Sequence, residues 1–285
     1  MQILNLANLE KSDIKYTISR FPDGEVQITL GEFSHKDEVN IRCRITSAED
    51  LFILMQVADI LVRHGIYFNI SIYYLMGMRM DRVMDFNRPF TLKMIVNILD
   101  SLGASDIAIF CPHSEMSLDL FRKTEVHAIY SEDWEKFMEE LTTSNDYQMM
   151  LPDAGAVKRY CYDDKPADSV LIGQKVRDLA TGNITSIGIA NPEALNGKRI
   201  LLVDDLCDGG GTFCGLAKAI REVNKNAKID IIVNHMVNPK GIENLSKTFD
   251  HVYFSNSYKN WNGIKAEYGK VVPTLPGNVT QIEVV

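Results

Sequence analysis

The sequence predicts an α/β protein of two domains, each with a mainly parallel sheet flanked by helices. Apolar, β-branched segments of strand length alternate with segments of helical period, which is the pattern of strand–helix–strand units. The chain has 285 residues, 46% hydrophobic and 24% charged, enough for one large or two ordinary domains. A polar stretch at 142–146 predicts domains of residues 1–145 and 146–285, which we expect to meet at a cleft.

The first half carries the signals of two helices and two strands. Apolar residues recur at helical spacing over 48–64, and Gly65 ends this predicted helix. The β-branched and aromatic run 66–74 predicts a strand after it. Pro89 suits the first position of a second helix, and residues 106–110 predict the strand that follows.

The second half repeats this alternation. Short apolar runs predict strands at 148–151, 169–172, 199–203 and 228–233, and one helical stripe predicts a helix over 212–223. Strands that are separated by helical segments pair in parallel, so we expect a second parallel sheet here.

The charge balance argues against nucleic acid as a partner. The formal net charge is −8, and a surface of that sign repels a phosphate backbone. A small anionic ligand stays compatible with the sequence, because backbone N–H groups and a few cations can hold one locally.

We expect a cytoplasmic protein that does not bind membranes. No apolar run approaches the roughly 18–20 residues that span a bilayer, and the first residues lack the basic and apolar segments of a signal peptide. The cysteines are odd in number and form no Cys-x-x-Cys pair, so we expect reduced thiols. They are Cys43, Cys111, Cys161, Cys207 and Cys214.

Residues 200–212 contain the most informative motif. An apolar strand leads into Asp204 and Asp205, three glycines follow Asp208, and a helix is predicted to begin at Thr212. This is the carboxyl end of a parallel strand, where open α/β sheets bind ligands. Glycines let backbone N–H groups approach an anion closely, and the helix N-terminus adds free donors.

The two acids in this motif suit a partner other than phosphate, because like charges repel. Asp204 and Asp205 could accept hydrogen bonds from ribose hydroxyls or share Mg²⁺ with a diphosphate. The alternative is a tight strand-to-helix turn, capped by Asp208, with a solvated acid pair. The motif is neither a Gly-Lys-Ser/Thr phosphate loop nor a Gly-x-Gly-x-x-Gly fingerprint.

The segment Val-Asp-Asp-Leu-Cys-Asp-Gly-Gly-Gly-Thr at 203–212 resembles the ribose-5-phosphate loop of the phosphoribosyltransferase superfamily. Motifs of the first half are similar to those of one branch, the ribose-phosphate diphosphokinases or PRPP synthetases, and simple phosphoribosyltransferases lack them. The matching segments are Phe-Pro-Asp-Gly-Glu at 21–25, Met-Arg-Met-Asp-Arg at 78–82, Arg-Pro-Phe-Thr at 88–91, Pro-His-Ser-Glu at 112–115 and Pro-Asp-Ala-Gly-Ala at 152–156. The resemblance extends over most of the chain.

The resemblance implies two phosphoribosyltransferase-like domains and a diphosphokinase that uses ATP and Mg²⁺. Such an enzyme transfers the β,γ-diphosphate of ATP to the C1 hydroxyl of ribose 5-phosphate, giving PRPP and AMP. The ATP-side motifs would lie in residues 1–145, and the ribose-phosphate loop and a mobile cation loop in 146–285. The family also implies a homo-oligomer, a dimer or hexamer, because the loop at Phe21 serves the site of a neighbouring subunit.

Site residues follow from the same resemblance. The expected catalytic cations are Lys175 and Arg177, which would close over the transferring diphosphate. The expected ATP-binding residues are Phe21, Asp23, Glu25, Arg79, Asp81 and His113. Asp204 and Asp205 would bind the ribose 2- and 3-hydroxyls, and the 5-phosphate would lie on Asp208, Gly209, Gly210, Gly211 and Thr212. The expected metal neighbours are His113 and Asp153.

Each of these segments also has a simpler interpretation. Residues 21–25 could be a turn that opens a strand, and Arg79 a surface cation paired with Asp81. The segment with Lys175 and Arg177 could be a solvated hairpin, and His113 could be structural.

The chain departs from the family pattern at three informative positions. Gly209 stands where the family usually has Thr, which removes a hydroxyl donor and opens space beside the phosphate. A larger acceptor such as ADP-ribose, from NAD metabolism, is therefore an alternative that would give ADP-ribose 1-diphosphate, with ribose 5-phosphate slightly ahead. Met80 stands for the usual Gln and Cys111 for the usual acid, which leaves open a catalytically silent, synthetase-associated subunit.

Overall fold

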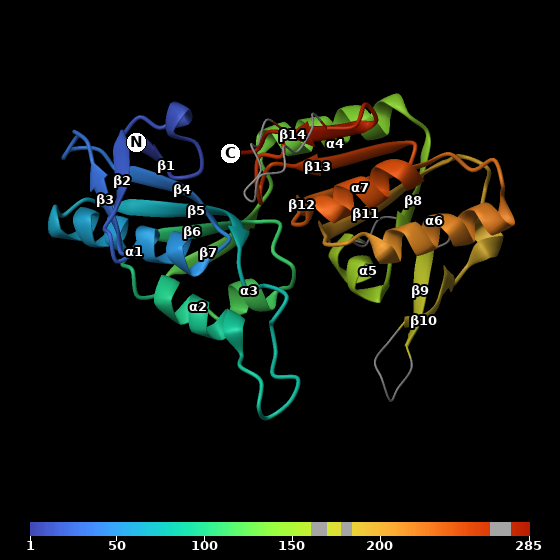
Figure 1. The fold of residues 1–285 in the computed structure, drawn as a ribbon, viewed down its shortest axis with the longest axis horizontal. Coiled ribbons are helices and arrows are strands. Elements are labelled where there is room, and N and C mark those ends of the chain that lie inside the picture. The colour runs from blue at the N-terminus through green and yellow to red at the C-terminus, as the bar shows by residue number, and fades with distance from the viewer. Residues whose placement is uncertain (161–169, 178–183, 263–274) are drawn as a thin grey trace. The chain divides into compact units, whose positions relative to one another are not determined.

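The computed structural model describes residues 1–160, 170–177, 184–262 and 275–285 (Figure 1). The chain divides into two compact units, Met1–Ser131 and Glu132–Val284. Each unit has its own parallel sheet and its own helices. The predicted α/β class is therefore confirmed for both halves of the chain.

The first unit is built on a five-stranded sheet in which every neighbouring pair is parallel. In sheet order its strands are β1 (Gln2–Asn5), β4 (Val39–Ile45), β5 (Phe68–Leu75), β6 (Asp106–Phe110) and β7 (Glu125–Ile129). The predicted strand at 106–110 is β6, and the one at 66–74 is β5. The sequence analysis missed β1, β4 and β7.

Three helices connect the strands of the first unit: α1 (Ala48–Arg63), α2 (Thr91–Leu99) and the single-turn α3 (Met116–Asp119). Ser47 and Asp50 form a reciprocal capping box that starts α1 where the periodicity predicts it. Phe90 has a non-helical backbone, so α2 begins at Thr91 and the expectation of a helix starting at Pro89 is wrong by two residues. A separate two-stranded sheet pairs β2 (Tyr16–Arg20) with β3 (Val26–Leu30).

The second unit is built on a seven-stranded sheet with the order β10-β9-β8-β11-β12-β13-β14. The strands are β8 (Tyr147–Leu151), β9 (Leu171–Arg177), β10 (Ile184–Ile189), β11 (Arg199–Cys207), β12 (Ile229–Met236), β13 (His251–Ser255) and β14 (Val279–Ile282). All neighbours pair in parallel except β9 and β10, which form an antiparallel edge.

The helices of the second unit are α4 (Glu132–Ser144), α5 (Ala154–Tyr160), α6 (Gly211–Val223) and α7 (Pro239–Thr248). The ring of Phe137 on α4 lies 5.3 Å from that of Tyr253 on β13, so α4 packs on this sheet. Short 3₁₀ turns occur at Leu9–Lys11 in the first unit and Pro192–Ala194 in the second.

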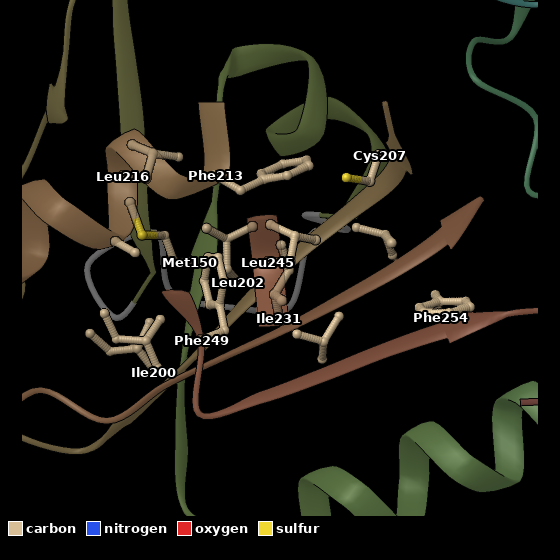
Figure 2. Packing of buried hydrophobic residues seen from close by; sticks show 14 of the residues in the cluster. Met150, Ile200, Leu202, Cys207, Phe213, Leu216, Ile231, Leu245, Phe249 and Phe254 are labelled. Carbon is tan, nitrogen blue, oxygen red and sulfur yellow. The ribbon is translucent and has the colours of Figure 1, made fainter. Parts of the chain in front are cut away.

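A single hydrophobic cluster joins the second sheet to α6 and α7. Leu202 of β11, Ile231 of β12 and Leu245 of α7 are fully buried at its centre (Figure 2). Every residue of β12 is buried, so the core continues to the carboxyl end of the central strands. This packing fixes the position of the segment that follows β11.

Candidate active site

The acid pair is part of strand β11 and does not lie in a loop after it. The strand was predicted to end at 203 but continues to Cys207, and Asp205 is only 2% exposed. The backbone N–H of Asp205 also donates to Asp204 Oδ1, at 2.9 Å. The alternative of a solvated acid pair is therefore wrong.

One guanidinium compensates both acids. Nη1 of Arg159, on α5, donates to Asp204 Oδ1 at 3.2 Å and also to Asp205 Oδ1. Burial raises the pKa of Asp204 well above its ordinary value, and the charge of Asp205 raises it further. The sequence analysis missed Arg159, because a basic residue on a short helix carries no signal that points to acids 45 positions away.

The glycine loop, residues 208–211, leads from β11 into α6. Gly210 has φ of +75°, a left-handed conformation that glycine adopts without strain, and its carbonyl accepts the first helical hydrogen bond from Cys214. The N-cap residue of α6 is Gly210, which makes no side-chain capping bond. The first N–H groups of such a helix are donors of the kind that bind an anion.

Asp153 lies directly after β8, the strand next to β11 in the sheet. Its Oδ1 accepts hydrogen bonds from the N–H groups of Gly155 at 3.0 Å and Ala156 at 3.1 Å. The carboxylate thus fixes the first turn of α5, the helix that carries Arg159. Asp153, Asp204 and Asp205 share one edge of the second sheet, because carboxyl ends of parallel strands meet there.

The two expected catalytic cations are placed only through their backbone. Lys175 and Arg177 belong to β9, where they pair with Ile187 and Ile184 of β10. Their side chains lie outside the part of the chain that the structure describes.

In the first unit, Arg79, Asp81 and His113 follow the carboxyl ends of β5 and β6. Asp81 is buried, and Arg82 donates two hydrogen bonds to its carboxylate, at 2.8 and 3.0 Å. The Arg82 hydrogen bonds, with smaller effects including the charge of His113, hold the pKa of Asp81 below its ordinary value. Arg82 is a residue of this cluster that the sequence analysis did not single out.

Cys111, next to His113, has φ of +45° and is the only non-glycine residue with positive φ in the described ranges. Its side chain is buried, so the apolar replacement of an acid is accommodated inside the unit. A left-handed backbone at this position turns the chain sharply after β6 and directs it into Pro112 and His113. Non-glycine residues in this conformation cluster at binding sites.

Phe21, Asp23 and Glu25 lie in the turn between β2 and β3. Phe21 and Glu25 pair through a backbone bond of 2.8 Å, Gly24 takes φ of +95°, and Asp23 Oδ1 accepts from the N–H of Glu25. The segment is a hairpin turn, as its simpler interpretation held. Phe21 is 49% exposed, so its ring is available to a ligand or another chain.

No family model matches the chain. The ribose-phosphate pyrophosphokinase of Helicobacter hepaticus is 27% identical over 254 residues, 87% of this chain and 81% of that protein. That of Thermosipho africanus is 25% identical over 260 residues, 86% of this chain and 78% of that protein. The chain is a homologue of the ribose-phosphate pyrophosphokinases. The resemblance that the motifs indicated is confirmed, and these relatives carry the name of the expected enzyme class.

A solved relative agrees at the level of the fold. The crystal structure of phosphoribosylpyrophosphate synthetase from Mycobacterium smegmatis matches 100% of this chain and 95% of its own, with a TM-score of 0.76 at 18% identity. This chain therefore shares its α/β fold with that synthetase.

Among the described residues, no helix is long and apolar enough to cross a membrane. No group of three or more His, Cys, Asp or Glu side chains within the same residues could hold a metal ion.

Proposed function

We propose that the chain is an ATP-dependent diphosphokinase that acts on ribose 5-phosphate. The C1 hydroxyl oxygen bonds to the β-phosphorus of ATP, the bond from that phosphorus to the α-phosphate oxygen breaks, and AMP leaves. The hydroxyl proton is released, and PRPP is the second product. The observation that carries this proposal is the continuity, along β11 and α6, of a largely buried acid pair, a glycine loop and a helix with glycine as its N-cap.

Each of these features would bind a different part of the acceptor. Asp204 and Asp205, which accept hydrogen bonds from Arg159 in this structure, would accept hydrogen bonds from the ribose 2- and 3-hydroxyls. The 5-phosphate would lie on Asp208, Gly209, Gly210, Gly211 and Thr212, where backbone N–H groups offer donors. In such a transfer the protein positions the reactants and neutralises charge rather than forming bonds.

The remaining expected residues would serve ATP. Lys175 and Arg177 would clamp the transferring diphosphate, and Arg79 would contact the phosphates as a bidentate cation. Phe21, Asp23 and Glu25 would hold the nucleoside across a subunit contact, with Asp81 and His113 completing the ATP side. We therefore propose a homo-oligomer, a dimer or hexamer, in the cytoplasm.

We propose Mg²⁺ as the required metal ion, with Asp153 and His113 as its protein neighbours. Mg²⁺ is usually held by one or two carboxylates together with substrate phosphates and water. The single carboxylate of Asp153, held at the start of α5 by the hydrogen bonds described above, fits that pattern. When bound, the ion would neutralise the triphosphate charge.

A second candidate acceptor is ADP-ribose, and the open space at Gly209 favours it. A Cβ at Gly209 or Gly211 would meet nothing within 4 Å, so the loop is open on that side. A phosphate with an ester substituent could be accommodated there, with the same transfer chemistry giving ADP-ribose 1-diphosphate.

The deciding experiment measures AMP release from ATP and Mg²⁺ with ribose 5-phosphate or ADP-ribose as acceptor, and identifies the product by mass. Turnover of ribose 5-phosphate alone supports an ordinary PRPP synthetase. A preference for ADP-ribose would make the open loop the determinant of the acceptor. No AMP with either acceptor would contradict the enzyme and favour a catalytically silent subunit.

A further inference from the structure

Two asparagine side chains of α7 hold the glycine loop. Nδ2 of Asn244 donates to the carbonyl of Gly209 at 2.8 Å, and Nδ2 of Asn238 donates to Asp208 Oδ1 at 2.9 Å. Asn238 is also the N-cap of α7, because its Oδ1 accepts from the N–H of Lys240 at 3.0 Å. Each asparagine therefore ties one residue of the loop to a helix far along the chain.

The loop and α7 are in direct backbone contact. A Cβ on Gly241 of α7 would lie 2.1 Å from the carbonyl oxygen of Asp208, a distance that no side chain tolerates. A Cβ on Gly210 would lie 3.1 Å from Cδ2 of Leu245. Glycine at 241 is what lets the N-terminal half of α7 approach the loop closely enough for both asparagines to reach it.

The contacts with α7 lie on one side of the glycine loop, a segment that is otherwise difficult to order. Three consecutive glycines lose more conformational freedom on fixation than any other sequence of this length. The opposite side of the loop is open at Gly209 and Gly211, as described above. Fixing the loop before the ligand arrives reduces the entropy cost of binding.

Asn238 has a second effect through charge. Asp208 carries a carboxylate within the loop that would bind a phosphate, and two anions repel. The hydrogen bond from Asn238 keeps one oxygen of that carboxylate directed at α7.

We propose that Asn238 and Asn244 are positioning residues that order the glycine loop for the acceptor phosphate. This inference rests on the proposed function, since it takes the loop as the phosphate site. Neither residue is expected to touch the reacting atoms. Both should therefore affect acceptor binding, and neither should affect ATP binding.

Replacement of either asparagine by aspartate tests this with little change in shape. Asn244→Asp exchanges the donor to Gly209 for an acceptor that repels its carbonyl. Asn238→Asp does the same towards Asp208 but remains a good helix cap, and its charge is favourable at the N-terminus of α7. Glu243→Gln, on the exposed side of α7 where it pairs with Lys247, is the matched control.

Three measurements on the full chain separate positioning from folding. We expect each Asn→Asp variant to raise the KM for ribose 5-phosphate about tenfold, the effect of one lost hydrogen bond near a charge. The KM for ATP should stay at the wild-type value, and the Tm should fall by no more than a few degrees, so that the chain stays folded in the assay. Without ligand, hydrogen exchange of residues 207–212 should become faster. The control should match the wild type throughout.

Two results would overturn the proposal. One is a variant whose KM for the acceptor and whose loop exchange rate equal those of the wild type. The other is a KM for the acceptor that rises only in proportion to a fall in Tm. The wild type is also titrated with ribose 5-phosphate and with ADP-ribose. If it binds neither, the proposed function fails and the phosphate role with it. The exchange rates still decide, in that case, whether α7 orders the loop.

Discussion

Asp204 combines a proposed role in binding with a cost in folding. Its carboxylate is largely buried beside that of Asp205, and the guanidinium of Arg159 contacts both acids. Burial and the neighbouring charge raise its pKa in the folded state above the unfolded value of about 3.9. Because the folded state holds this proton more tightly, stability falls as the pH rises above that value.

We therefore predict that Asp204→Asn abolishes transfer to the acceptor but raises the Tm at neutral pH by about 2–4 °C, which corresponds to about 1 kcal/mol in a unit of this size. The gain should disappear below about pH 3.5, where the carboxyl is protonated in both the folded and unfolded states. Thermal melts from pH 3 to 8 measure this. A variant less stable than the wild type at pH 7 would show that the attraction between Arg159 and Asp204 outweighs the cost of burying the charged carboxylate.

Lys175 tests the transfer step at the level of one side chain. Lys175→Ala should abolish AMP formation, because a fixed cation is expected to neutralise the charge that develops on the diphosphate. The matched control is Lys198→Ala, which removes an exposed lysine of the same unit that pairs with Asp146 and should retain full activity. Unchanged turnover in Lys175→Ala would remove this residue from the mechanism.

Strand β12 carries a buried carboxylate that is hydrogen-bonded to three other strands of the sheet. Asp230 is fully buried and accepts two hydrogen bonds from Arg199 of β11, at 2.6 and 2.7 Å. It also accepts from the hydroxyl of Tyr147 on β8 and from the N–H of His251 on β13. Four donors on one carboxylate fix the register at the amino ends of the central strands, and hence at their carboxyl ends.

We predict that Asp230→Ala lowers the free energy of unfolding of the second unit by about 3–5 kcal/mol, the usual cost of breaking a buried ion pair. Glu243→Gln, which breaks the exposed pair with Lys247, should cost no more than about 1 kcal/mol. Urea denaturation followed by tryptophan fluorescence suits the comparison, because Trp134 and Trp261 are both buried in the second unit. Equal losses in the two variants would contradict the role of Asp230.

Elements were predictable where their signals are local. The helix at 48–63 has both a periodic apolar face and a capping box, and α6 begins at the last of three glycines that follow a strand. The end of β11 was missed because adjacent acids disfavour a buried strand, and their compensation comes from Arg159 on another element. Helix α7 was missed although Asn238 and Pro239 give the usual start signal.

The parts of the candidate site that are close together in the sequence were also predictable. The acid pair and the glycine loop form one continuous segment, so the sequence alone shows that they are neighbours. The hydrogen bonds of Asn238 and Asn244 to that loop depend on tertiary packing across 30 and 35 positions. Such contacts leave no pattern in a single sequence.

At the scale of the whole molecule, the proposed acceptor site belongs to one unit. Every residue expected to touch the acceptor sugar or its phosphate lies in the second unit, in β11, the glycine loop and the start of α6. The first unit carries Arg79, Asp81 and His113, all expected on the ATP side.

Ribose 5-phosphate alone should therefore slow hydrogen exchange in the second unit, most strongly over 204–214, and leave the first unit unchanged. ATP with Mg²⁺ should protect the first unit around residues 79–82 and 111–115. Exchange measured by mass spectrometry on the full chain, with each ligand alone, gives both patterns at once, and inorganic sulfate controls for general anion effects. Protection of the first unit by the acceptor alone would show that the sugar site draws on both units, and would contradict this division.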